Sequence, residues 1–179
     1  NVCGVITEAY QGCNACIMPK HYGRALRAWC DAHGALFVCD EVQAGFGRCG
    51  TWFGFEHLGI VPDLACFGKG VSGGMPLSAV AGTEEVMSLY GPGEMTSTHS
   101  ANPICSAAAM ANIDVIDQEG LVEKAAAMHP IIMDAAREME KSANGHIGRV
   151  DGVGMVVALQ FVVPGTKTIA RDTAWRVVK

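Results

Sequence analysis

The sequence predicts an α/β protein in which helices flank a mostly parallel sheet. Two short apolar runs, residues 36–39 and 64–67, each end at a charged residue or a glycine, which is typical of buried parallel strands. A segment with apolar residues at helical spacing, residues 19–33, separates the first of these runs from an earlier one. Alternation of strand, helix and strand indicates an α/β sheet.

The first half of the chain supplies the predicted sheet. Residues 2–9 are expected to form a buried strand with a polar end at Glu8, and a turn-rich stretch follows at residues 11–14. Pro19 favours the first position of a helix, and Gly34 is placed to end that helix. Residues 36–39, 64–67 and 77–80 are the next strands, in a sheet that we expect to be covered on both faces.

The second half of the chain is mostly helical. Asn102 and Pro103 predict a cap and a first turn for a helix that reaches about residue 116. A second helical run covers residues 121–141, and we expect a kink or break at Pro130, because an interior proline costs about 3 kcal/mol. Residues 155–163 predict a strand of a smaller unit. We therefore expect two parts, residues 1–116 and the beginning of a second domain at 117–179.

Composition excludes several classes of protein. Half of the 179 residues are apolar and 17% are charged, so the chain can bury a sizeable core. A net charge of −5 without a basic stripe argues against nucleic-acid partners, and no apolar run is long enough to cross a membrane. No signal peptide is visible, and we expect a cytoplasmic protein. Cys13 and Cys16 form a single C-x-x-C pair, which does not by itself indicate a metal, and we expect none.

Asp40 follows the apolar run 36–39, at the end of a predicted parallel strand. Open α/β sheets bind their ligands at this edge. Asp40 and Val42 are expected to share a face, because side chains on a strand alternate. This face would offer a carboxylate for the proton of a pyridine nitrogen and an apolar surface beneath the ring. The alternative is an aspartate that caps a turn.

Lys69 lies among glycines at the end of the next strand, in F-G-K-G-V-S-G-G (residues 67–74). Glycines let the backbone approach a ligand closely, and a desolvated lysine amine is a nucleophile. The spacing is not that of a phosphate-binding P-loop, in which Ser or Thr follows the lysine, whereas here Gly70 does. Taken alone, a lysine flanked by glycines is better explained by a surface loop.

The order of these motifs resembles the class III (omega) aminotransferases, a family that depends on pyridoxal phosphate. The resemblance covers nearly the whole chain, and the segments that carry it are E-A-Y-Q-G (residues 8–12), F-V-C-D-E-V-Q-A-G-F-G-R (37–48), V-P-D-L (61–64), G-K (68–69), S-T-H-S-A-N-P (97–103) and G-R-V-D-G-V-G-M (148–155). It implies the fold-type I (aspartate aminotransferase-like) architecture. Residues 1–116 would then be the C-terminal part of the large cofactor domain, and 117–179 the start of the small domain.

The resemblance also implies roles for individual residues. Lys69 would hold pyridoxal 5'-phosphate as a Schiff base and move a proton between substrate and cofactor. Asp40 would keep the pyridine nitrogen protonated, so that the ring accepts electrons. Val42 would pack on the ring and Gln43 would hydrogen-bond its phenolic oxygen. The two remaining cofactor contacts come from Glu8, near the polar edge of the ring, and from Thr98, which would bind the phosphate of the neighbouring subunit in a homodimer.

The implied activity is transamination of an amino acid or omega-amine with a keto-acid or aldehyde acceptor. Four positions depart from the family pattern: Cys13 replaces a substrate-gating glutamate, Asp151 an arginine, Ala101 a glycine and Ala9 a proline. The first two leave the substrate open. Racemases or epimerases, aminomutases and a decarboxylase resemble the family in the same motifs and are alternatives. Since the family's N-terminal half is not in the sequence, a catalytically silent fragment is a further alternative.

Overall fold

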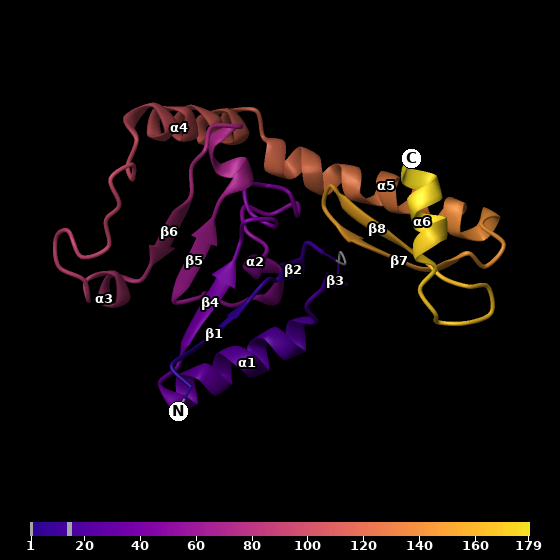
Figure 1. Cartoon of the computed structure of the whole chain (residues 1–179), viewed down its shortest axis with the longest axis horizontal. Coiled ribbons are helices and arrows are strands. Elements are labelled where there is room, and N and C mark those ends of the chain that lie inside the picture. The colour runs from indigo at the N-terminus through magenta and orange to yellow at the C-terminus, as the bar shows by residue number, and fades with distance from the viewer. Residues whose placement is uncertain (1, 14–15) are drawn as a thin grey trace.

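The computed structural model describes residues 2–13 and 16–179 (Figure 1). Within these residues the chain forms one four-stranded sheet and two small hairpins, with helices around them. The strands are β1 (Gly4–Thr7), β2 (Tyr10–Gln11), β3 (Cys16–Ile17), β4 (Leu36–Asp40), β5 (Leu64–Phe67), β6 (Ala79–Gly82), β7 (Ile147–Val153) and β8 (Val156–Phe161). The helices are α1 (Lys20–His33), α2 (Phe55–Leu58), the 3-10 helix η1 (Lys69–Ser72), α3 (Glu84–Met87), α4 (Pro103–Gln118), α5 (Leu121–Ser142) and α6 (Arg171–Val178).

The four-stranded sheet has the order β1-β4-β5-β6. Strands β1, β4 and β5 are parallel, whereas β6 runs antiparallel to β5. The prediction of an α/β protein with a mostly parallel sheet is therefore confirmed. The register places Asp40 opposite Cys66 at the ends of β4 and β5. Lys69 follows three residues later, so the two predicted site residues leave the sheet at the same edge.

One face of the sheet is buried and the other is open. Phe37 and Cys39 of β4 have no exposed surface and pack with Cys30 of α1. On the other face, Ile6 keeps 66% of its surface exposed and Val80 keeps 52%. The expectation that both faces are covered is wrong for the described residues, because α1 and α2 lie against the face of Phe37 alone.

Asp63 fixes the start of β4 against α1. One of its carboxylate oxygens accepts the backbone N–H of Phe37 at 2.6 Å and a guanidinium N–H of Arg27 at 2.7 Å. Arg27 also pairs with Asp31 one helical turn further along, at 2.6 Å. The guanidinium lies 5.5 Å from the centre of the Phe37 ring. The aspartate of the V-P-D motif thus stabilises the strand that carries Asp40.

Helix α1 begins and ends close to the predicted residues. Gly34 ends it with φ of +62°, a left-handed conformation that suits glycine. Pro19, predicted to be the first helical residue, is instead the N-cap, one position before the first residue of α1. The predicted turn-rich stretch, residues 11–14, begins at the last residue of β2 and precedes β3, and the sequence did not predict the hairpin that these two strands form. Asn14, the last residue of that stretch, lies outside the described residues.

Helices α4 and α5 follow one another along the upper side of Figure 1 and connect the sheet to the β7–β8 hairpin. The predicted cap is confirmed, because the Asn102 side chain accepts the backbone N–H groups of Ile104 and Cys105 at 3.0 and 3.3 Å. The sequence predicted a kink or break at Pro130, and the break is absent because α5 continues through this residue. Buried contacts along α5 outweigh the lost hydrogen bond. Its buried residues are Val122, Ala125, Met133 and Ala136.

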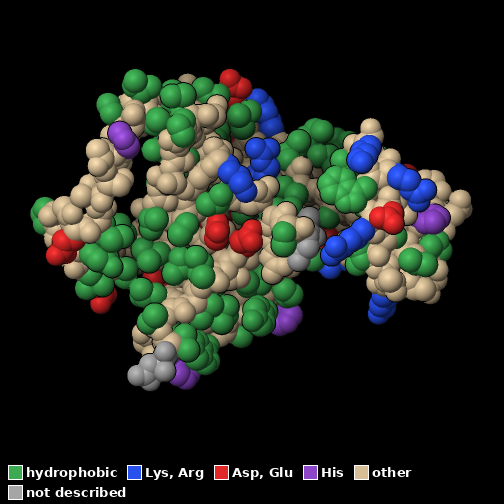
Figure 2. Space-filling model, in the orientation of Figure 1, with side chains coloured by type: hydrophobic (Ala, Val, Ile, Leu, Met, Phe, Trp, Pro, Cys, Tyr) green, Lys and Arg blue, Asp and Glu red, His purple; other side chains and the backbone are tan. Residues whose placement is uncertain are grey.

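The C-terminal part is built on an antiparallel hairpin. The strand predicted at residues 155–163 is β8, and it pairs with β7, a strand that was not predicted from the sequence. Figure 2 shows that basic side chains gather in this half of the visible face, whereas hydrophobic side chains are spread over the sheet half. In the part of the chain that the structure describes, no helix has both the length and the apolarity to span a membrane.

Candidate active site

A cavity of about 560 Å³ lies beside Lys69. It is bounded by the turns after β4, the loop after β5, the facing ends of α4 and α5, and the β7–β8 turn. Its volume is in the range of small-molecule sites. The lining residues are Val42, Gln43, Gly45, Phe46, Gly47, Arg48, Lys69, Gly70, Gly73, Gly74, Asn112, Ile116, Leu121, Ala125 and Met155.

Lys69 and Gln43 face each other in the wall of this cavity. The Lys69 amine donates a hydrogen bond to the side-chain oxygen of Gln43. Val42 lines the same wall, and its Cγ1 atom would lie 3.4 Å from a Cβ added at Gly68. The structure therefore brings together three of the six predicted site residues at one cavity.

Asp40 reaches the site through the backbone. Its carboxylate accepts the N–H of Val42 at 3.0 Å and does not line the cavity. Strand β4 ends at Asp40, and turns cover residues 42–49. The predicted reason for the proximity of Asp40 and Val42, alternation along one strand, is therefore wrong, because a side-chain hydrogen bond across the first turn joins them instead.

Glu8 acts on Gln43 through a glycine. The Glu8 carboxylate accepts the N–H of Gly12 at 2.8 Å and so closes the loop after β1. Gly12 then lies so near Gln43 that a Cβ at this position would come within 2.9 Å of its Cγ atom. A side chain at residue 12 would therefore displace Gln43, the residue that faces Lys69.

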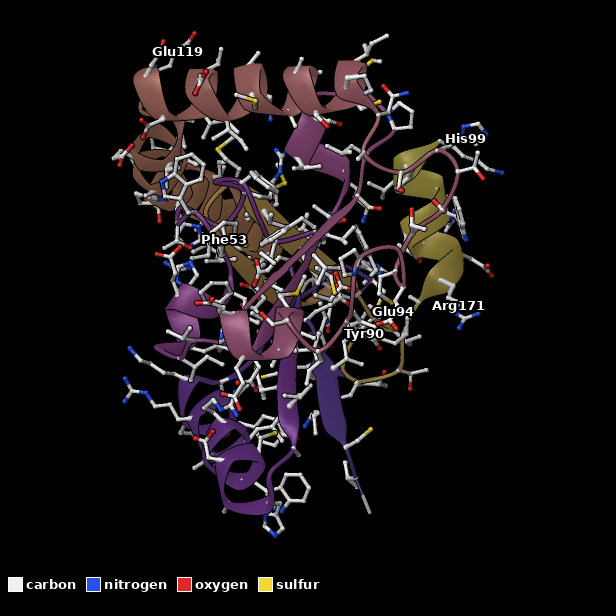
Figure 3. All side chains as sticks on the ribbon, turned by 90° about the vertical axis from the view of Figure 1, so that its left-hand side faces the viewer. Phe53, Tyr90, Glu94, His99, Glu119 and Arg171 are labelled. Atoms are coloured by element: carbon white, nitrogen blue, oxygen red, sulfur yellow. The ribbon has the colours of Figure 1, made fainter. Side chains whose placement is uncertain are left out.

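Thr98 is not brought to this cavity. It lies in an exposed segment between α3 and α4 that leaves the sheet at its β6 edge (Figure 1). In Figure 3 Tyr90, Glu94 and His99 mark the course of this segment. Its internal hydrogen bonds join residues that are close in sequence. The N–H of Gly91 donates to the Glu94 carboxylate, and the Ser100 hydroxyl donates to the carbonyl of Ser97.

Glu41 is a buried carboxylate that the sequence reasoning did not single out. It is 1% exposed, and its two oxygens accept the N–H groups of Gly54 and Phe55 at 2.7 and 3.0 Å. Burial raises the pKa of Glu41 to about 7, although the two N–H groups act in the opposite direction. Strand alternation is the sequence signal that could have identified Glu41, because it directs the residue after Asp40 to the opposite face. Glu41 holds the turns that carry Val42 against the start of α2.

The charged groups of the lining are cations. Arg48 and Lys69 are the two charged residues of the lining, and Gln43 and Asn112 add amide groups. Burial raises the pKa of the Cys39 and Cys49 thiols to about 12, so these nearby cysteines are un-ionised. The site offers an amine, a guanidinium and amides, together with a carboxylate one hydrogen bond away. This set suits a polar, anionic small molecule.

Comparison with known proteins places this chain in a family. Residues 1–178 match the aminotransferase class-III family. The 5-aminovalerate aminotransferase DavT of Pseudomonas aeruginosa is 40% identical over 166 residues, which are 92% of this chain and 39% of that protein. The 4-aminobutyrate aminotransferase of Mycobacterium leprae is 38% identical over 167 residues, 93% of this chain and 37% of that protein.

Solved structures give the same result. An S-selective transaminase from Arthrobacter sp. superimposes with a TM-score of 0.85 at 35% identity, over 93% of this chain and 36% of that one. A transaminase from the marine bacterium Virgibacillus has a TM-score of 0.88 at 31% identity, over 98% of this chain and 41% of that one. The fold is that of the fold-type I transaminases. The chain spans about two fifths of the length of the curated relatives it matches, and it belongs to the class III aminotransferases.

Proposed function

We propose that the full-length protein is a pyridoxal-phosphate-dependent aminotransferase that moves an amino group from an amino acid or omega-amine to a keto acid or aldehyde. The observation that carries the proposal is the pair of Lys69 and Gln43 in one cavity wall, at the edge of the sheet where Asp40 ends β4. Family membership supports it. The curated relatives compared above are all aminotransferases, which favours transamination over racemisation, aminomutation or decarboxylation.

The residues present fit the cofactor. Pyridoxal phosphate needs an amine for its aldehyde carbon, an acceptor for its ring N–H, and a donor for its phenolic oxygen. Lys69 and Gln43 would supply the amine and the donor from the cavity wall. Asp40, which is hydrogen-bonded to Val42 of the same wall, would supply the acceptor. Five glycines in the lining leave parts of the wall without side chains, and a Cβ at Gly70 would meet no atom within 4 Å. A flat ring therefore has room beside Lys69. When bound, the cofactor supplies an electron sink for the carbon that loses a proton.

The residues of this chain would then divide the work as follows. The Lys69 amine would hold the cofactor, and once displaced by the substrate amine it would move a proton from the substrate carbon to the cofactor carbon that carried the aldehyde. Asp40 keeps a negative charge at the ring nitrogen. Gln43 orients the phenolic oxygen and Val42 packs on the ring, while Glu8 keeps Gln43 in place through its bond to Gly12. Glycines around the amine let the substrate approach closely.

We further propose a homodimer with shared sites, in which Thr98 binds the cofactor phosphate held by the partner. The exposure of the segment around Thr98, and its distance along the sheet from the cavity side, support this arrangement. In the same proposal residues 1–116 belong to the large domain and 117–179 begin the small one. The gap between α4 and α5, at residues 119–120, lies close to this boundary.

The donor that we propose is an amine at the end of a short carbon chain that bears a carboxylate. Two relatives at 38 to 40% identity are named for 4-aminobutyrate and 5-aminovalerate. The cationic lining agrees with a carboxylate in the substrate. The described residues contain no disulfide, which is consistent with a reducing compartment, and we propose the cytoplasm.

The experiment uses the full-length protein with pyridoxal phosphate. We expect a visible absorption band that borohydride bleaches, a label on the peptide that contains Lys69, and transfer of the amino group from 4-aminobutyrate or 5-aminovalerate to a keto acid. A label on Lys20 or Lys124 would refute the assignment of the lysine. A correctly labelled protein that racemises or decarboxylates amino acids without transferring nitrogen would refute transamination.

A further inference from the structure

The loop that carries Lys69 contains an unfavourable backbone conformation. Lys69 has φ of +44°, in the left-handed region that residues other than glycine rarely adopt. Such a conformation costs about 1 to 2 kcal/mol. The turn of η1 begins at this residue and ends at Gly73, which is also left-handed. Contacts from outside the loop are therefore needed to keep the amine in place.

Asn112 supplies such a contact from α4. Its amide nitrogen donates to the carbonyl of Gly70 at 2.8 Å and to the carbonyl of Val71 at 3.3 Å. These carbonyls belong to the two residues that directly follow Lys69. The bonds join positions 42 and 41 residues apart in sequence, so one side chain ties the loop to a separate helix.

The helix places this amide where the loop needs it. Asn112 follows the buried Ala109 by three residues and precedes the buried Ile116 by four, so the three side chains share one face of α4. Asn112 and Ile116 both line the cavity. On the loop side, a Cβ at Gly73 would lie 3.2 Å from the amide oxygen of Asn112. The loop is therefore shaped to receive this amide, with glycine at the closest approach.

We propose that Asn112 is a positioning residue for Lys69. Its hydrogen bonds go to the loop backbone and not to the Lys69 amine. By holding the carbonyls of Gly70 and Val71 it keeps Lys69 in its left-handed conformation, with the amine directed at Gln43. The proposal rests on the assignment of Lys69 as the lysine that holds the cofactor. A purely structural hydrogen bond would contribute to overall stability without a particular effect on the lysine.

The test compares Asn112→Asp and Asn112→Ala in the full-length protein, with Gln118→Glu as the control on the exposed end of the same helix. Asp keeps the shape of Asn and loses the amide donor. Backbone hydrogen exchange in the cofactor-free protein should show residues 68–74 opening about tenfold more often in both Asn112 variants, the effect of losing about one hydrogen bond. Exchange in β4 and β5 should be unchanged, and the control should resemble the wild type.

In the cofactor-loaded protein kcat should fall about tenfold while KM for the amine stays within about twofold, and the visible absorption maximum should shift. Unchanged exchange in residues 68–74 would overturn the proposal. So would an equal loss of protection in β4 and β5, which indicates general destabilisation, or a loosened loop with unchanged kcat and spectrum. If the wild type transfers no amino group, the proposed function fails, but the exchange comparison still decides whether Asn112 holds the loop.

Discussion

Lys69 and Gln43, 26 residues apart in the chain, meet by a hydrogen bond from the lysine amine to the amide oxygen. Each stands a few residues beyond the end of a neighbouring parallel strand. Three other predicted site residues lie close to this pair. Asp40 accepts a hydrogen bond from the N–H of Val42, and Val42 lines the same cavity wall. Glu8 accepts the N–H of Gly12, which lies beside Gln43. The candidate site is therefore organised around one lysine–amide contact, and its predictions concern the residues that support it.

Asp40 can be tested with two substitutions that separate its charge from its hydrogen bond. Asp40→Asn keeps an oxygen that accepts the N–H of Val42, whereas Asp40→Ala does not. We expect turnover to fall about 100- to 1000-fold in both, because an unprotonated ring withdraws electrons poorly. Steady-state kinetics of the cofactor-loaded protein measures this. Near wild-type turnover in Asp40→Asn alone would limit Asp40 to a structural role.

Gly12 should tolerate no side chain. In Gly12→Ala the new methyl group would lie 2.9 Å from Cγ of Gln43 and displace the amide from Lys69. Because Gln43 is proposed to bind the phenolic oxygen of the cofactor, loss of that one hydrogen bond predicts about a tenfold loss of cofactor affinity, measured by equilibrium titration. Gly91→Ala is the matched control, since its nearest neighbour is 3.5 Å away in the exposed segment. Equal affinity in the two variants would contradict the role of Gly12.

Glu41 should make the stability of the fold depend on pH. Its pKa rises from 4.5 to about 7 on folding, so the folded state binds the proton more tightly than the unfolded state. The corresponding stability is fully present below pH 4.5 and is lost as the pH rises through about 7. The full shift corresponds to about 3 kcal/mol.

Chemical denaturation between pH 4.5 and pH 8 measures this dependence. Glu41→Gln should remove that part of the pH slope, whatever its effect on stability at one pH. Glu56→Gln serves as the control, because the exposed Glu56 accepts the N–H of Phe53 in the same region. Its loss should leave most of the slope, since burial is the largest cause of the raised pKa of Glu41 and the charge of Glu56 a smaller one. An undiminished slope in Glu41→Gln would show that other groups cause it.

Thr98 is predicted to act on the partner's cofactor. Thr98→Val keeps the shape of the side chain and removes the hydroxyl, and cofactor affinity should fall about 10- to 100-fold, since hydrogen bonds to charged acceptors contribute about 1.5 to 3 kcal/mol. Mixing this variant with Lys69→Ala should form heterodimers in which one site carries both defects and the other neither. Activity near that of one intact site per dimer is the expected result. Absence of recovery after proven subunit exchange would place Thr98 in the site of its own chain.

The sequence by itself determined the features that depend on short-range chemistry. Apolar runs, and their alternation with a helical segment, identified β4 and β5. The cap at Asn102 marked the beginning of one helix, and the glycine at residue 34 marked the end of another. The glycines around Lys69 marked the loop. Family resemblance then supplied the candidate roles. These signals lie within a few residues of each other, so the sequence displays them directly.

Only the tertiary structure decided which distant groups meet. It turned β6 antiparallel, carried α5 through Pro130, buried Glu41 beneath α2 and brought Asn112 to the loop of Lys69. No short stretch of sequence predicts any of these four features. Each depends on a residue 13 or more positions away, or on packing that outweighs a local preference. The energy of a proline in a helix or of a buried carboxylate is set by its surroundings, and those surroundings exist only once the chain has folded.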